Sequence, residues 1–157
     1  MAKKVSVWIA MIALVVGSST PVAVRAADTV VSVSSASAAA GEEVALTVRV
    51  SDVADMVGFR IGITWPEELE FVANSMEKTD ATSSLLIAIN ENPVSYEGHG
   101  VLASAANATA LNGSLDLVTF RMRVPADTPT GTYTITVDAK TRLNDGAIPV
   151  TYQHGSI

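Results

Sequence analysis

The sequence predicts an all-β fold, a sandwich or a jelly roll, for the part of the 157-residue chain that follows residue 26. Two observations predict it. Short segments alternate between apolar and polar residues, and turn signals rich in Gly, Pro and Asn recur about every ten residues, without a helical stripe. In the clearest segment, residues 57–65, every second residue is apolar, which is typical of a central strand with one buried face. Its inward residues are Phe59, Ile61, Ile63 and Trp65.

The N-terminus has the pattern of a cleavable secretory signal peptide. Lys3 and Lys4 precede a short apolar run, and Val24-Arg25-Ala26 supplies a cleavage site. The run is too short to span a bilayer comfortably, although an uncleaved anchor is the alternative. We therefore expect a signal peptide at residues 1–26 and one β-sandwich domain at residues 27–157, secreted and extracellular or associated with the cell surface.

The predicted mature chain is acidic. Removal of Lys3, Lys4 and Arg25 leaves seven basic residues against 16 acidic ones, a net charge of −9. Such a surface argues against nucleic acid or an anionic membrane as partner. The chain has no cysteine and no second apolar stretch that could span a membrane. Its length after cleavage is sufficient for a hydrophobic core without disulfides.

Eight further segments bring the prediction to about nine strands. They are residues 30–34, 44–50, 69–72, 85–90, 101–106, 115–124, 132–138 and 150–157. The run at residues 85–90 is apolar throughout, which favours a buried strand. Residues 73–84 form the longest predicted loop, with room for a helical turn. In the segment 115–124, Leu117 and Val118 are both available to the core.

Three stretches together resemble a bacterial cohesin domain. The first is GFRIGITW at residues 58–65, running into Leu69. The second is LNGSLDLVTFRMRV at residues 111–124, and the third is LNDGAIPVTYQHGSI at residues 143–157. The resemblance covers roughly residues 29–157, and the order and spacing of the three stretches make it specific.

The resemblance implies a nine-stranded jelly roll that docks a dockerin-bearing protein through one face of a sheet. Calcium is then expected on the dockerin and no cofactor on this chain, and the pair would assemble polysaccharide-degrading or cell-surface complexes. The fold is also akin to that of certain carbohydrate-binding modules. One departure concerns the family's Tyr-Asp-Pro: Trp65 takes the Tyr place and Pro66 follows at once, so the Asp is missing. The chain also ends where a final strand would begin, which suggests a fragment or a minimal module.

The predicted partner face is the outward side of the central strand and of its expected neighbours. It comprises Arg60, Gly62, Thr64, Leu102, Ser104, Thr134, Thr136 and Asp138. The two outer threonines, Thr134 and Thr136, count as site residues only through the resemblance. If Val101 and Ala103 face the core, Leu102 points outward as an interface anchor. A register slip of one residue would instead make Leu102 part of the core.

Direct binding of polysaccharide is the alternative function, and an envelope or adhesion domain without a dockerin partner is a third. Sugar-binding platforms present exposed aromatic rings. Most aromatic residues of the mature chain instead occupy strand positions that are predicted to face the core: Phe59, Trp65, Phe120 and Tyr133. Tyr96 and Tyr152 are free to be exposed, and Tyr96, near Glu97 and His99, lines a small sugar site or lies at a loop tip.

Catalysis and metal binding are not expected. The sequence lacks the motifs of nucleophilic and phosphate-binding enzymes. A carboxylate pair for glycoside hydrolysis stays open, because its two residues can be distant in the sequence and meet only in the folded protein. His99 and His154 lack ligand spacing. Asn144-Asp145-Gly146 matches a calcium loop only in part, which favours a plain turn.

Overall fold

The structure, a computed structural model, describes residues 28–157, so the predicted signal peptide at residues 1–26 lies outside the described residues. Strands and short 3₁₀ turns make up its regular structure, which confirms the all-β prediction. The strands are β1 (Val30–Val33), β2 (Glu43–Thr64), β3 (Glu70–Phe71), β4 (Glu77–Lys78), β5 (Leu86–Asn90), β6 (Gly100–Arg123), β7 (Thr134–Val137), β8 (Arg142–Leu143), β9 (Thr151–Gln153) and β10 (Gly155–Ser156). The turns are η1 (Asp80–Thr82), η2 (Val94–Tyr96) and η3 (Asn144–Gly146). Within this part of the chain, no helix has the length and apolar character needed to cross a membrane.

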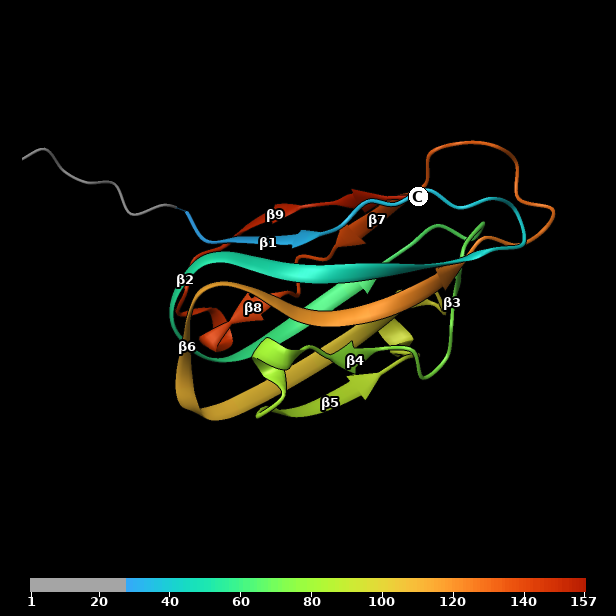
Figure 1. Ribbon diagram of the computed structural model, residues 1–157. Coiled ribbons are helices and arrows are strands. Elements are labelled where there is room, and N and C mark those ends of the chain that lie inside the picture. The colour runs from blue at the N-terminus through green and yellow to red at the C-terminus, as the bar shows by residue number, and fades with distance from the viewer. Residues whose placement is uncertain (1–27) are drawn as a thin grey trace, which may run out of the picture.

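Strands β2 and β6 organise the fold. They are 22 and 24 residues long, pair antiparallel, and fold back together at the same end of the molecule (Figure 1). The predicted strands at residues 44–50 and 57–65 are therefore two arms of one bent strand. At the bend, Asp52 and Asp55 have φ of 55° and 53°, a left-handed conformation that Asp tolerates better than most residues. Register shifts between Val50 and Gly58 absorb the change of direction.

The two arms of each long strand lie in opposite layers of a sandwich. We call the front sheet the layer formed by β5, residues 100–106 of β6, residues 58–64 of β2, and then β7 and β8. The back sheet consists of β9, β1, residues 43–50 of β2 and residues 115–123 of β6, with β3 and β4 at its edge. Strand β10 pairs with β7. The arrangement confirms the predicted β-sandwich.

Two asparagine side chains hold the bend of β2. The Oδ1 atom of Asn144 accepts hydrogen bonds from the amides of Val57 (2.8 Å) and Gly58 (3.2 Å), and its Nδ2 donates to the carbonyl of Asp55 (2.8 Å). The amide of Asp55 donates to Oδ1 of Asn112 (2.9 Å). These bonds satisfy backbone groups that the irregular ladder leaves unpaired. The Asn-Asp-Gly turn is thus a structural clamp.

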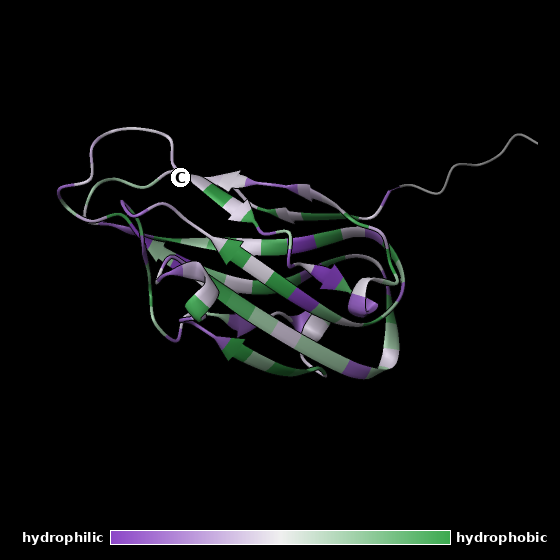
Figure 2. Cartoon of the chain, turned by 180° about the vertical axis from the view of Figure 1, so that it is seen from behind, coloured by the Kyte–Doolittle hydropathy of each residue, from purple (hydrophilic) through white to green (hydrophobic). Residues whose placement is uncertain are grey.

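The core lies between the two sheets and matches the predicted alternation. Phe59, Ile61, Ile63 and Trp65 are all buried, and Figure 2 shows hydrophobic and hydrophilic bands alternating along the strands. Leu117 and Val118 are also both buried, because the register with β2 shifts between Val48 and Arg49. The extra residue of this bulge turns two consecutive side chains inward.

Three aromatic rings stack on one another, and the middle one, Phe71, is partly buried and packs against the core. The ring of Phe71 lies 5.4 Å from that of Trp65 and 6.2 Å from that of Phe120, measured between centroids. These rings fill the space between the layers and leave little aromatic surface for a ligand.

One predicted strand differs in its burial. Residues 85–90 were expected to be a buried strand, yet β5 is an edge strand that pairs with β6 alone. Leu86 is consequently 84% exposed and Ile89 37% exposed, whereas Leu85 just before the strand is buried. An apolar run alone does not reveal whether a strand has neighbours on both sides. The predicted loop at residues 73–84, which had room for a helical turn, contains the short strand β4 and the 3₁₀ turn η1.

Candidate functional site

The outer face of the front sheet brings together most residues of the predicted partner face. Cross-strand pairing arranges its outward side chains in rows, because paired residues of adjacent strands point to the same side. The rows are Leu86, Ala106 and Gly58; Ala88, Ser104, Arg60 and Arg142; Asn90, Leu102 and Gly62; and Gly100, Thr64 and Thr136. The residues between them along each strand, such as Ile61 and Ala103, are buried.

The structure places the predicted residues unequally on this face. Arg60, Thr64, Leu102 and Ser104 lie side by side. Thr136 pairs with Thr64, whereas Thr134 pairs with Ser156 of β10 beyond the end of β2. Thr134 is therefore at the margin of the face.

Leu102 has the outward orientation. Its neighbours Val101 and Ala103 are fully buried, while Leu102 itself is only partly buried. The register slip that would have moved Leu102 into the core does not occur. Its role as an interface anchor stays a prediction.

Tyr96 covers part of the face, which overturns two expectations. Its side chain is only 8% exposed, although it was expected to be free for exposure. It lies over Gly62 and Gly100, where a Cβ at either position would overlap the tyrosine side chain. Gly62 is therefore buried and cannot itself present surface to a partner, because the ring of Tyr96 stands above it.

Polar contacts fix Tyr96 in this position. Its hydroxyl donates to Oδ1 of Asp138 (3.1 Å), and the ammonium of Lys140 lies 4.2 Å from the ring centroid. Burial, followed by the neighbouring Asp138 carboxylate, raises the pKa of Tyr96 to about 12. Asp138, a predicted site residue, thus acts here as a support for Tyr96.

Replacing Tyr96 by Phe should change the alkaline stability profile. The pKa of a tyrosine in an unfolded chain is about 10, so the folded state holds this proton more tightly. Its contribution to stability is complete below about pH 10 and is lost as the pH rises toward about 12. Urea unfolding midpoints measured from about pH 9 to 12 should therefore fall more steeply for the wild type than for Tyr96→Phe. The control Tyr152→Phe should retain the steep wild-type decline, and parallel curves for wild type and Tyr96→Phe would contradict the assignment.

Comparison with known proteins identifies the family. The family model of the cohesin domain matches residues 29–157. The chain belongs to the cohesin domain family. This result confirms the resemblance read from the three sequence stretches. No curated protein sequence matches the chain.

Solved structures agree with the cohesin fold at low sequence identity. A non-cellulosomal cohesin from the hyperthermophilic archaeon Archaeoglobus fulgidus is 18% identical, with a TM-score of 0.69 over 83% of this chain and 89% of that one. The seventh ScaB type I cohesin from Pseudobacteroides cellulosolvens is 17% identical, with a TM-score of 0.64 over 83% and 90%. A type I cohesin–dockerin complex from Clostridium thermocellum is 14% identical, with a TM-score of 0.65 over 82% and 96%. Since one of these cohesins is archaeal, a bacterial origin stays a prediction.

Three residues on the front of this cohesin domain escaped sequence reasoning. Leu86 was assigned to a buried strand, Arg142 was not singled out, and Tyr96 was expected at a small sugar site or a loop tip. Alternation could have found only the first, because Leu86 and Ala88 are out of phase with Leu85 and Ile87. Arg142 and Tyr96 reach the face through long-range pairing and packing, which no local pattern reports.

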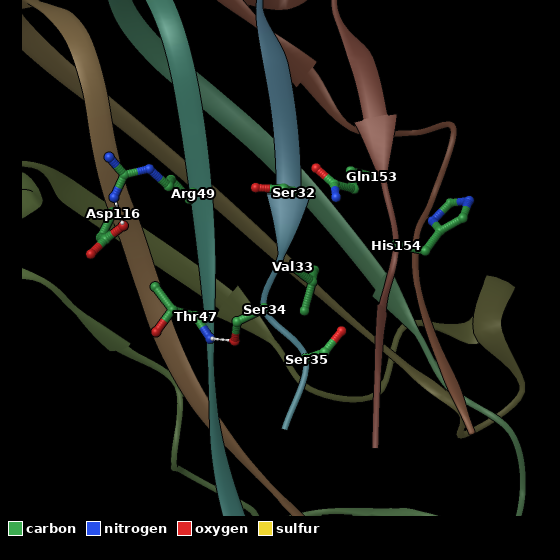
Figure 3. Close-up of a pocket in the computed structure, with 9 residues that line it drawn as sticks. All are labelled: Ser32, Val33, Ser34, Ser35, Thr47, Arg49, Asp116, Gln153 and His154. Atoms are coloured by element: carbon green, nitrogen blue, oxygen red, sulfur yellow. Dashed lines mark hydrogen bonds and ion pairs between the residues drawn. The ribbon is translucent and has the colours of Figure 1, made fainter. Parts of the chain in front are cut away.

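The outer face of the back sheet is polar, and one charged pair on it, Arg49 with Asp116, is internally neutralised. Asp116, Arg49, Ser32 and Gln153 form one row across four strands (Figure 3). They line a shallow groove of about 350 Å³. The guanidinium of Arg49 donates to Asp116 at 2.9 Å, so the two charges neutralise each other. The amide of Thr47 donates to Oγ of Ser34, also at 2.9 Å.

His154 at the rim of this groove has a structural contact. Its Nδ1 accepts a hydrogen bond from the amide of Val137 at 3.1 Å. Residues 28–157 contain no group of three His, Cys, Asp or Glu side chains that could hold a metal ion. Among the aromatic side chains of the same residues, Tyr152 is the one that is exposed.

Proposed function

We propose that this cohesin domain is a non-catalytic docking module that binds a dockerin-bearing protein through the outer face of its front sheet. The observation that carries the proposal is the face itself. It is formed by rigid strands and presents the apolar side chains of Leu86 and Leu102 among hydrogen-bonding groups. Exposed apolar residues within a polar surround are typical of protein interfaces.

The family supports the same partner. One of the similar structures is a cohesin–dockerin complex, and its cohesin fold is the fold of this chain. The proposal places the domain outside the cell, secreted or at the cell surface, in assemblies that degrade polysaccharides or decorate the surface. Calcium in such a complex belongs to the dockerin, and no cofactor is assigned to this chain.

Direct polysaccharide binding receives less support. Trp65 and Phe120 pack in the core. Tyr96 lies at the sheet surface but is buried there, with its hydroxyl bonded to Asp138. Flat sugar platforms need several exposed rings side by side, whereas among residues 28–157 Tyr152 on the back sheet is the one exposed aromatic side chain. The dockerin titration below distinguishes the docking module from an envelope domain without a dockerin partner.

Binding to a dockerin should depend on calcium. The purified chain from Ala27 onward is titrated by calorimetry with each dockerin encoded in the same genome, with Ca²⁺ and with a chelator. We expect saturable 1:1 binding in calcium and its loss in chelator. Absence of binding to every dockerin, together with binding in a glycan screen, would replace the proposal by the sugar-binding alternative.

A further inference from the structure

Two arginines stand directly opposite each other on the front face. Arg60 in β2 pairs with Arg142 in β8, and both side chains are exposed. Their neighbours Phe59, Ile61, Thr141 and Leu143 are buried, so both guanidinium groups point outward. Directly paired residues of antiparallel strands have Cβ atoms about 5 Å apart, and like charges in such pairs destabilise a sheet.

Neither arginine has a partner within residues 28–157. No ion pair or side-chain hydrogen bond there involves Arg60 or Arg142. Every other lysine and arginine of these residues is engaged. Arg49 pairs with Asp116, Arg121 and Arg123 pair with Glu43, Lys78 donates to the carbonyls of Ser83 and Leu85, and Lys140 lies over the ring of Tyr96.

The nearby carboxylates do not neutralise the pair. Asp138 accepts from the Tyr96 hydroxyl and from the amide of Lys140 (2.7 Å). Asp145 is exposed near Arg142 but forms no ion pair within 4.0 Å among the described residues. A chain with far more acidic than basic residues thus keeps two adjacent cations unpaired on the face proposed for docking.

The surface beside Arg60 is also hollowed. A depression of about 360 Å³ is lined by Arg60, Ser104 and Asn107, and also by Val57 and the exposed Asp145. A carboxylate side chain entering it could accept from a guanidinium, a hydroxyl and an amide group. Arginine is well suited to this role, because its planar fork binds a carboxylate with two parallel hydrogen bonds.

We infer that the dockerin recognised by this face carries an acidic patch, with carboxylates that bind Arg60 and Arg142. This inference rests on the proposed function and specifies its partner. A polyanion such as nucleic acid fits poorly, because it would extend over the acidic remainder of the surface. A pair of carboxylates confined to this site contacts only the surface around the two arginines. Physiological salt screens its repulsion by acidic residues more than about 8 Å away.

The test compares charge changes on the two sheets. The probes are the purified dockerins of the same genome in calcium, measured by calorimetry at low and high salt. Arg60→Gln with Arg142→Gln should weaken binding roughly 10- to 100-fold and reduce its salt dependence. The matched control, Arg121→Gln with Arg123→Gln, makes the same charge change on the back sheet and should bind like the wild type.

Charge reversal of the two arginines is the decisive part of the experiment. Arg60→Glu with Arg142→Glu should abolish binding, and a dockerin whose acidic patch is changed to lysines should restore it. If wild type and the glutamine pair bind the same dockerin equally, this inference fails while the proposed function stands. If no dockerin binds the folded wild type, both fail. Unfolding curves of each variant show whether a loss of binding reflects a loss of structure.

Discussion

Leu102→Asp is expected to reduce the affinity for the dockerin by roughly 30- to 1000-fold, the range of a hot-spot side chain worth about 2–4 kcal/mol. Leu102 lies in the middle of the front face, paired with Gly62 on one side and Asn90 on the other. A carboxylate at this position would be desolvated in the complex without a partner, which adds to the loss of apolar contact. Calorimetry of the variant with the wild-type dockerin measures the effect.

The fold should tolerate Leu102→Asp. Leu102 is partly exposed, so the free energy of unfolding should fall by only about 1 kcal/mol, the span of strand preferences. The control Thr47→Asp introduces the same charge on the outer side of the back sheet and should leave affinity unchanged. Leu102→Asp with full affinity would remove Leu102 from the interface. Global unfolding of the variant would show that its contacts belong to the core.

Gly155→Ala should produce the largest loss of stability from a single methyl group, about 3 kcal/mol. Gly155 is buried in β10, where a Cβ would overlap the carbonyl oxygen of Ser34 and lie 2.9 Å from that of Val33. Both obstacles are backbone oxygens, one of the last residue of β1 and one of the residue that follows it, so relief requires β10 to move away from its place beside β7. Chemical denaturation of the two proteins gives the difference.

Gly131→Ala is the matched control for this substitution. A Cβ at Gly131 would meet only the ring of Tyr133, at 3.5 Å or more, an ordinary contact. The alanine should be neutral or stabilise the fold by about 0.5 kcal/mol, because it restricts the unfolded chain. Equal stability losses for the two variants would show that the close packing around Gly155 does not matter.

The sequence was most informative where one strand buries one face. The period-two pattern of Phe59, Ile61, Ile63 and Trp65 predicted both the strand and the outward position of Arg60, and the structure agrees. For Leu102 the pattern left an outward and a core position open, and the structure shows the outward one. These predictions succeed because a strand that is buried on one side has an apolar residue at every second position, a pattern visible in the local sequence.

Features that depend on pairing over long distances were not visible. The continuity of β2 around its bend relies on Asn144 and Asn112, which are distant in the chain. The exposure of Leu86 depends on β5 having no outer neighbour. Tyr96 reaches Gly62 from a short turn, and only the tertiary fold explains why Gly62 is buried there.

Hydroxyl-radical footprinting of the chain, free and bound to its dockerin, tests most directly whether the front sheet is the docking face. Mass spectrometry then reports the solvent exposure of individual side chains. We expect that oxidation of Leu86 and Leu102 falls strongly in the complex, while that of His154 on the opposite side stays the same. Protection of His154 and the back groove, with Leu86 and Leu102 still oxidised, would contradict it.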